Sequence, residues 1–263
     1  MIPKIINYCW FGGNPFPPVV KQCMDSWRKY CPDYQIKEWN ESNFDLGSCR
    51  YAKQAYDDQM WAFVSDYARL KILFDFGGIY VDTDVEILRN LDPLLLNNAF
   101  MGFQDDLVVN TGLICGSIPK LSIIGELVRE YETLEFINID GKYNLTPCVD
   151  YQTRLLERYG LVRENRIQWV EGIKIFPTDY FCPFNIYTGK LKITDMTYSF
   201  HKFEGSWAPE SGRHGNKLKW KYMNKYGVLL GSVIRIFPYS FYIIKHHGLN
   251  ELFHKIKSRF NLK

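Results

Sequence analysis

The stretch SDYARLKILFDFGGIYVDTDV, residues 65–85, decides the fold. Its first part belongs to a helix predicted over residues 60–76, because apolar residues occupy most of the helix circumference there. Gly77-Gly78 ends this helix, and residues 79–81 form a short apolar strand that leads directly into Asp82-Thr83-Asp84. Open α/β sheets bind ligands beyond the carboxyl ends of their strands. The two aspartates are therefore expected at a binding site.

The chain on both sides of this stretch predicts further strands and helices. Residues 4–10 and 34–39 are predicted as strands, with a helix between them that runs from Pro17-Pro18 to Tyr30. A strand, a helix and a second strand in this order imply a parallel sheet. Further strands are predicted at residues 99–103, 112–115 and 197–202, and further helices at residues 121–131 and 150–159. The predicted fold class is α/β, with a Rossmann-like, mostly parallel sheet flanked by helices.

The C-terminal residues differ from the rest in charge. We expect the α/β domain to cover residues 1–215 and a helical, basic extension to cover residues 216–263. Residues 219–263 contain nine Lys or Arg against the single acid Glu251, so they carry a charge of +8 in a chain of net charge +3. Residues 228–244 are strongly apolar, but Arg235 and Pro238 interrupt them, and they are shorter than a membrane span. Two interpretations stay open: a segment in the headgroup region of an anionic membrane, or a helix that packs on the core.

Residue usage excludes several classes of protein. All five histidines lie at or after position 201, which excludes an H-E-x-x-H metalloprotease. The seven cysteines include no C-x-x-C pair, so neither a disulfide framework nor a structural zinc site is expected. The first residues contain no apolar stretch long enough for the core of a signal peptide. We expect a cytoplasmic protein, with peripheral contact to the inner face of the plasma membrane through its basic end, and no nucleic-acid partner.

Four charged side chains of the decisive stretch are suited to binding chemistry. In an extended chain Asp82 and Asp84 point the same way, so both carboxylates can bind one divalent cation together with phosphate oxygens. Asp66 and Arg69 share one face of the predicted helix. Charges in a buried helix are costly without partners. The two residues therefore form either a structural ion pair or a site in which Asp66 binds sugar hydroxyls and Arg69 holds a sugar or phosphate.

The order of these features resembles the DXD-containing glycosyltransferases of family 32 and, more distantly, the catalytic domain of the large clostridial glucosylating toxins. The resemblance rests on IPKIINYCWFGG at residues 2–13, on residues 65–85, and on HKFEGSW at residues 201–207. It implies a GT-A type fold, a nucleotide-diphosphate-sugar donor, a bound Mn²⁺ or Mg²⁺, and transfer with retention of anomeric configuration.

The resemblance also assigns roles to individual residues. Donor binding would involve residues on four segments: Trp10 against the base, Asp66, Arg69 and Tyr80 in the sugar and phosphate pocket, and Ser206 and Trp207 over the diphosphate. The metal ligands would be Asp82, Asp84 and His201. Arg69 and Asp82 would also be catalytic residues. Apart from the resemblance, a retaining reaction needs either a nucleophile beneath the sugar or a same-face attack assisted by the leaving phosphate. Asn110 is the preferred candidate for a group at that position, among the polar residues Asp105, Asp106, Asn110, Asp150 and Gln152. Structural roles stay open for Trp10, His201 and the Ser206-Trp207 pair.

The sequence thus predicts a metal-dependent retaining transferase that moves a hexose to a glycan acceptor, free or lipid-linked, in polysaccharide or capsule biosynthesis. UDP-galactose or UDP-glucose is favoured as the donor over GDP-mannose. One alternative is a Mg²⁺-dependent phosphatase of the haloacid dehalogenase type, but its motif has Thr or Val two residues after the second Asp, where Glu86 stands here. The other is a non-catalytic, membrane-attached sugar-binding protein, which would leave the four charged residues without a purpose.

Overall fold

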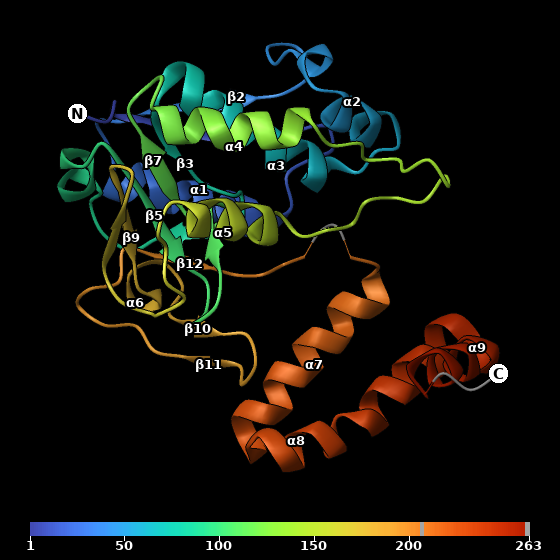
Figure 1. The fold of residues 1–263 in the computed structure, drawn as a ribbon. Coiled ribbons are helices and arrows are strands. Elements are labelled where there is room, and N and C mark those ends of the chain that lie inside the picture. Colours follow the sequence, from blue (N-terminus) through green and yellow to red (C-terminus); the bar gives the residue numbers. More distant parts are fainter. Residues whose placement is uncertain (206–207, 261–263) are drawn as a thin grey trace. The chain divides into compact units, whose positions relative to one another are not determined.

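The computed structural model describes residues 1–205 and 208–260, and these form two compact units (Figure 1). The first unit comprises Met1–Pro183 and Lys192–Phe203, and the second comprises Phe184–Leu191 and the residues from Glu204 onward. The domain boundary expected at residues 215 and 216 falls inside helix α7 (Glu210–Tyr226). The second unit also contains a hairpin that the sequence did not predict, β10 (Phe184–Asn185) and β11 (Lys190–Leu191).

An eight-stranded sheet forms the centre of the first unit, in the order β2-β1-β3-β7-β5-β9-β8, with β6 paired to β5. Its strands are β1 (Ile5–Cys9), β2 (Gln35–Trp39), β3 (Gly78–Tyr80), β5 (Ala99–Phe103), β6 (Val109–Asn110), β7 (Cys115–Ser117), β8 (Gln168–Val170) and β9 (Ile173–Phe176). The pairings give β2, β1, β3, β5 and β9 one direction, while β6, β7 and β8 run the opposite way. The prediction of a mostly parallel sheet is confirmed.

Two hydrophobic cores lie on the two faces of this sheet. Alternate residues of a strand point to opposite faces, and accordingly Ile79 and Val81 belong to one core whereas Tyr80 belongs to the other. Helix α1 (Pro18–Tyr30) covers the first core. Helices α2 (Arg50–Asp57), α3 (Trp61–Phe76), α4 (Ser122–Glu132) and α5 (Cys148–Arg158) contribute to the second. The short helix α6 (Thr178–Phe181) adds Phe181 to the core beneath α1.

Helix α3 ends where the sequence predicts, and the structure gives the reason. Gly77 has φ +68°, and a Cβ atom there would lie 2.8 Å from the carbonyl oxygen of Ser117. Only glycine fits this combination of a left-handed backbone and a close neighbouring strand. The chain therefore leaves α3 and enters β3 without a connecting loop, which fixes where β3 delivers the DXD residues.

One predicted strand is displaced. A strand was expected over residues 112–115, but residues 111–113 form a turn and β7 begins only at Cys115. The cause is the Asn110 side chain, whose Oδ1 accepts the Gly112 backbone N–H at 2.6 Å. This local hydrogen bond competes with the ladder of the sheet.

A second, two-stranded sheet brings the C-terminal part of the first unit to the DXD residues. Strand β4 (Val85–Ile87) pairs antiparallel with β12 (Ser199–His201), and the register places His201 opposite Val85. Val85 directly follows Asp84, so residues more than 110 positions apart in sequence meet here. The strand predicted over residues 197–202 is confirmed.

The second unit is mainly helical, with α7, α8 (Val228–Ile234) and α9 (Ile236–Phe260) in sequence. Among the described residues one helical stretch, Val228–Lys255, is long and apolar enough to cross a membrane, with a mean hydropathy of 1.4 and 11% of its apolar window buried. Gly248 breaks it with a non-helical φ of 84°. The low burial is not that of a core helix.

Substitution of Trp27 tests how firmly α1 is attached to the strand after the DXD residues. Trp27 is fully buried, and its indole N–H donates to the Val85 carbonyl at 2.7 Å. Trp27→Phe removes the donor from this buried carbonyl and should lower the free energy of unfolding by about 1–3 kcal/mol, measured by urea titration. The matched control is Trp169→Phe, since Trp169 is 62% exposed, and it should change stability by less than about 0.5 kcal/mol. Equal losses in the two variants would contradict the role of the buried hydrogen bond.

Candidate functional site

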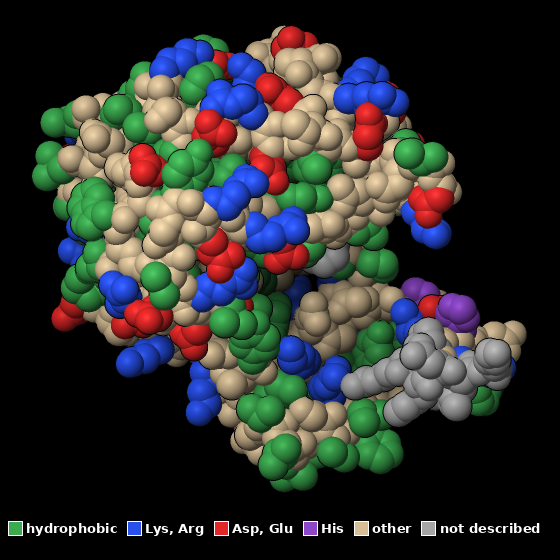
Figure 2. Space-filling model, viewed as in Figure 1, with side chains coloured by type: hydrophobic (Ala, Val, Ile, Leu, Met, Phe, Trp, Pro, Cys, Tyr) green, Lys and Arg blue, Asp and Glu red, His purple; other side chains and the backbone are tan. Residues whose placement is uncertain are grey.

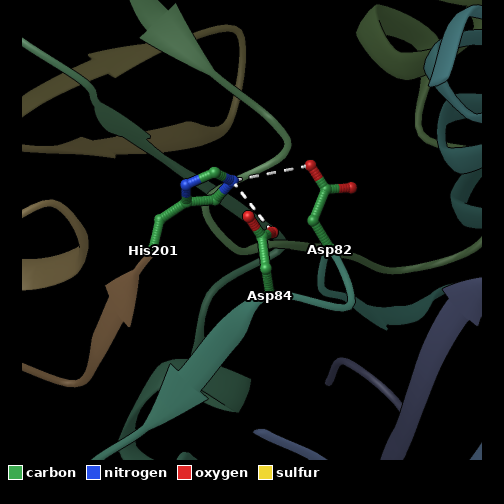
Figure 3. A group of neighbouring side chains, drawn as sticks. All are labelled: Asp82, Asp84 and His201. Carbon is green, nitrogen blue, oxygen red and sulfur yellow. Dashed lines mark ion pairs between the residues drawn. The ribbon is translucent and has the colours of Figure 1, made fainter. Parts of the chain in front are cut away.

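Asp82, Asp84 and His201 converge at the end of β3 (Figure 3). One ligand atom from each residue lies within 4.8 Å of the others. His201 Nε2 is 3.3 Å from Asp84 Oδ1 and 3.8 Å from Asp82 Oδ2. The backbone N–H of Phe203 donates to His201 Nδ1 at 3.0 Å, which orients the ring with Nε2 toward the carboxylates. The structure thus brings together the three side chains that the resemblance assigns to the metal.

This donor set fits a divalent cation. Two carboxylate oxygens and one imidazole nitrogen are ligands that Mn²⁺ accepts, and carboxylates are the usual ligands of Mg²⁺. Burial tends to raise the pKa of Asp82, but Arg69 and His201 outweigh it and lower that pKa below its ordinary value. Burial likewise tends to lower the pKa of His201, but Asp84 and Asp82 outweigh it and raise that pKa. Two carboxylates that place negative charge at one point, with an imidazole nitrogen beside them as a third donor, are suited to hold a positive ion.

Arg69 links these residues to helix α3. Its Nη2 lies 3.1 Å from Asp66 Oδ1 and 3.0 Å from Asp82 Oδ1, and its side chain is only 4% exposed. The pair expected from the spacing of Asp66 and Arg69 is therefore present, with Asp82 as a third member that the sequence did not predict. Asp82 divides its two oxygens, because Oδ1 binds Arg69 while Oδ2 faces His201.

Burial is the largest influence on the pKa values of Asp66 and Arg69. It raises the pKa of Asp66 to about 6, although Arg69 acts in the opposite direction. It also tends to lower the pKa of Arg69, but Asp82 and Asp66 outweigh it and hold the guanidinium charged. The ring of Tyr80 lies 5.2 Å from Arg69 Cζ and is 1% exposed, and burial raises its pKa well above the ordinary value. Tyr80 thus contacts Arg69 from the core.

Asn110 lies next to this cluster, and Gly112 makes room for it. Asn110 Nδ2 donates to Gln104 Oε1 at 2.7 Å, while Oδ1 accepts the Gly112 N–H, so both ends of the amide are held. A Cβ atom at Gly112 would overlap Asp82 Oδ2 and would lie 3.0 Å from Asn110 Oδ1 and 3.1 Å from Arg69 Nη1. Gly112 was not among the predicted site residues, although the Asn110-Thr111-Gly112 order is typical of a turn.

The remaining polar candidates have different surroundings. Gln152 is fully buried and binds both the backbone and the hydroxyl group of Thr111. Asp105 accepts two backbone N–H groups of its own loop. Asp106 and Asp150 are exposed. A further residue at the site is Cys148, the first residue of α5, whose Sγ accepts from Arg69 Nη1 at 3.7 Å. No sequence signal pointed to Cys148.

Trp10 follows directly after β1 and is partly buried. Its indole N–H donates to the Asn14 carbonyl at 2.7 Å, and its ring packs at 4.8 Å against Phe16. The ring is thus held by its own loop rather than enclosed in the core. Ser206 and Trp207 lie outside the described residues.

Comparisons with known proteins show what parts of this chain are similar to. Residues 17–101 match the family model described as "Glycosyltransferase sugar-binding region containing DXD motif". The resemblance to DXD-containing glycosyltransferases is confirmed. The matched residues of this chain include Asp66, Arg69, Asp82 and Asp84. The match ends before Asn110 and His201. It favours a transferase over the phosphatase of the haloacid dehalogenase type.

Individual relatives match different lengths of the chain. An uncharacterized glycosyltransferase of Acanthamoeba polyphaga mimivirus is 23% identical over 252 residues, which cover 88% of this chain and 92% of that protein. Inositol phosphoceramide mannosyltransferase 3 of Schizosaccharomyces pombe is 34% identical over 102 residues, which cover 36% of this chain but only 27% of that protein. The solved structure of PaToxG glycosyltransferase aligns with a TM-score of 0.46 at 19% identity, over 60% of this chain and 69% of that one.

Gly112→Ala tests the crowding at the centre of the site. The added methyl group must displace Asp82 or Arg69, so Mn²⁺ affinity should fall about tenfold or more, equivalent to at least about 1.4 kcal/mol. The affinity is measured by electron paramagnetic resonance of bound Mn²⁺. Gly212→Ala is the matched control, because a Cβ atom there meets nothing within 4 Å. Unchanged Mn²⁺ affinity in a folded Gly112→Ala variant would show that this spacing does not matter.

Proposed function

We propose that this protein is a metal-dependent, retaining glycosyltransferase of GT-A type, which transfers a hexose from a nucleotide-diphosphate sugar to a glycan acceptor. The observation that carries the proposal is the convergence of Asp82, Asp84 and His201 within 4.8 Å, beside the buried guanidinium of Arg69. The family match over residues 17–101 supports the same reaction class.

The residues of the site divide the work of binding the donor. Asp82, Asp84 and His201 would hold Mn²⁺ or Mg²⁺, which supplies positive charge against the diphosphate. Arg69, held charged by two carboxylates, adds a second positive group near the leaving phosphate. Asp66 would accept hydrogen bonds from sugar hydroxyls.

Three further residues complete the proposed donor site. Trp10 would stack on the base, a role that its place at the end of β1 supports. Ser206 and Trp207 would close over the diphosphate. Tyr80, which is enclosed in the core, would act by packing against Arg69.

Retention of configuration requires that the acceptor oxygen joins the anomeric carbon on the face that the phosphate leaves. The acceptor O–C1 bond forms while the bond from C1 to the phosphate oxygen breaks, and the acceptor proton passes to the leaving phosphate. An amide is a weak nucleophile, so Asn110 would position the sugar rather than attack it. The two hydrogen bonds that fix both ends of its amide support this positioning role.

The donor is proposed to be UDP-galactose or UDP-glucose, with GDP-mannose as the alternative, and the acceptor to be a glycan of polysaccharide or capsule biosynthesis. The name of the S. pombe relative specifies a ceramide lipid as its substrate, which supports a lipid-linked acceptor here and contact with an anionic membrane. A reducing, cytoplasmic compartment is proposed because the seven cysteines are scattered along the chain and include no C-x-x-C pair. A thermal-shift panel of nucleotide sugars with Mn²⁺ tests the donor, because a ligand that binds the folded state raises its stability.

Substitution of the DXD carboxylates tests the metal site. Asp84→Ala and Asp82→Asn should each abolish transfer and the slow hydrolysis of the nucleotide sugar, because each removes a charged ligand from a three-ligand site. EDTA should have the same effect on the unmodified protein. Asp25→Asn is the control, since the Asp25 side chain is 76% exposed and pairs with Arg28 on helix α1. Full activity in EDTA or in Asp84→Ala would overturn the metal assignment.

Substitution of Trp10 tests the binding site for the base. If the ring stacks on the base, Trp10→Ala should weaken nucleotide binding by about 1–3 kcal/mol, measured by isothermal titration calorimetry in the presence of Mn²⁺. Trp10→Phe keeps an aromatic face and should recover most of the affinity. Trp169→Ala is the matched control at an exposed tryptophan. If Trp10→Ala lowers stability but not nucleotide affinity, Trp10 is a packing residue.

A further inference from the structure

The helices α8 and α9 carry an apolar face that nothing in the described chain covers. Seven large apolar side chains on it are between 41% and 87% exposed: Leu229, Leu230, Val233, Ile236, Phe237, Phe241 and Ile244. At 3.6 residues per turn these positions fall on one side of the helix. Figure 2 shows hydrophobic side chains gathered over α8, with Lys and Arg side chains beside them.

The opposite side of α8 and α9 packs on α7. Gly231 approaches so closely that a Cβ atom there would lie 2.5 Å from the Tyr222 carbonyl oxygen. Further along, the Tyr239 ring lies 2.9 Å from the position of a Cβ atom on Gly215. The Tyr242 ring stacks on His214 at 3.8 Å. Since residues 222, 215 and 214 of α7 meet residues 231, 239 and 242 in that order, the two segments run antiparallel along each other.

Helix α7 is too polar to enter hydrocarbon. It contains Arg213, Lys217, Lys219, Lys221 and Lys225, and each charged side chain at the centre of a bilayer costs several kcal/mol. If α8–α9 crossed the membrane, either α7 would have to enter the membrane with it or the contacts between α7 and α8–α9 would be lost. A helix that lies in the membrane plane avoids both costs, because its apolar face turns to lipid while α7 stays in water.

The charge of this region matches an anionic surface. Residues 211–250 contain seven Lys or Arg and no Asp or Glu. Basic residues near an anionic bilayer are attracted to it, and added salt weakens the attraction. A second copy of this chain would present the same positive charge, which disfavours self-association through this face.

We propose that the apolar face of α8 and α9 lies flat in the interface of an anionic phospholipid membrane, with α7 on its aqueous side. This inference deepens the membrane contact proposed above by assigning the face, the orientation and the lipid charge. In this orientation a transferase that uses a soluble donor would lie next to a lipid-linked acceptor while α8 and α9 stay in the plane of the membrane.

The first measurement is binding of the full chain to vesicles of phosphatidylglycerol or of phosphatidylcholine. Binding should be strong to the anionic vesicles, weak to the neutral ones, and reduced by salt. Leu229→Asp should weaken binding to anionic vesicles tenfold or more, because Leu229, at 87% exposure, is the most exposed of the seven apolar side chains. Leu96→Asp is the matched control, as Leu96 is 77% exposed in the first unit, and it should bind like the unmodified chain.

The second measurement is depth in the membrane. Nitroxide labels on Leu230→Cys and Ile244→Cys, each in a Cys148→Ser background because the other six cysteines are buried, should report equal depths from accessibility to oxygen and to a nickel chelate. These positions are 14 residues apart, so a spanning helix would separate them by about 21 Å along the membrane normal.

The outcomes separate the orientation from the proposed membrane contact. Three results would overturn both the membrane contact and the in-plane orientation. These are no binding to anionic vesicles, an equal loss of vesicle binding in Leu229→Asp and Leu96→Asp, or a stable dimer that Leu229→Asp dissociates. Binding with depths that differ by about 20 Å would overturn only the in-plane orientation. Hydrolysis of the nucleotide sugar in solution is measured on the unmodified chain and on Leu229→Asp, which should be equally active. Its absence from the unmodified chain would count against the transferase proposal and not against the membrane face.

Discussion

The buried bridge from Arg69 to Asp66 and Asp82 is the interaction on which the site depends. A single nitrogen, Nη2, lies 3.1 Å from one carboxylate and 3.0 Å from the other. Asp66 and Arg69 belong to α3, whereas Asp82 follows β3, so the bridge ties the central helix to the strand end. Removing one partner of such a buried group leaves an uncompensated charge and costs about 3–5 kcal/mol. The position of the DXD carboxylates is therefore coupled to the position of α3 on the sheet.

This coupling explains why one aspartate serves two purposes. Asp82 Oδ1 is occupied by Arg69, which leaves Oδ2 on the side of His201 and Asp84. The guanidinium lowers the pKa of Asp82 and keeps it ionised despite burial. Arg69 and Asp82 thus place a positive and a negative group side by side. This arrangement suits a diphosphate and the cation that accompanies it. The structural role of the Asp66–Arg69 pair is therefore compatible with the role in donor binding proposed for it.

The parts of this arrangement that the sequence predicted are those that depend on local order. The end of α3 at Gly77 and the strand β3 follow from periodicity and from stop signals within twenty residues. The two DXD carboxylates do converge, but the predicted extended chain is wrong: Thr83 and Asp84 form a turn, in which the Val85 N–H donates to the Asp82 carbonyl at 3.0 Å. Asp82 as a partner of Arg69, and Gly112 and Cys148 as neighbours of both, were missed because these contacts exist only once β7 and α5 are packed against α3. The displaced strand before Cys115 has a local cause, the Asn110 side chain, but propensity alone did not reveal it.

The two most apolar helical segments show why composition could not assign their environment. Helix α3 is apolar nearly all round, so it lies between other helices and the sheet. Its few charges pair with one another, with Asp82 after β3, or with Lys120. The segment α8–α9 is also strongly apolar, but Gly231 and Tyr239 face α7 while its large apolar residues, including Phe237 and Phe241, are exposed. What distinguishes α3 from α8–α9 is the direction in which the apolar side chains point: into the core in α3, and away from the described chain in α8–α9. That direction depends on the polar helix α7, whose close contacts at Gly215 and Gly231 fix the rotation of its partner.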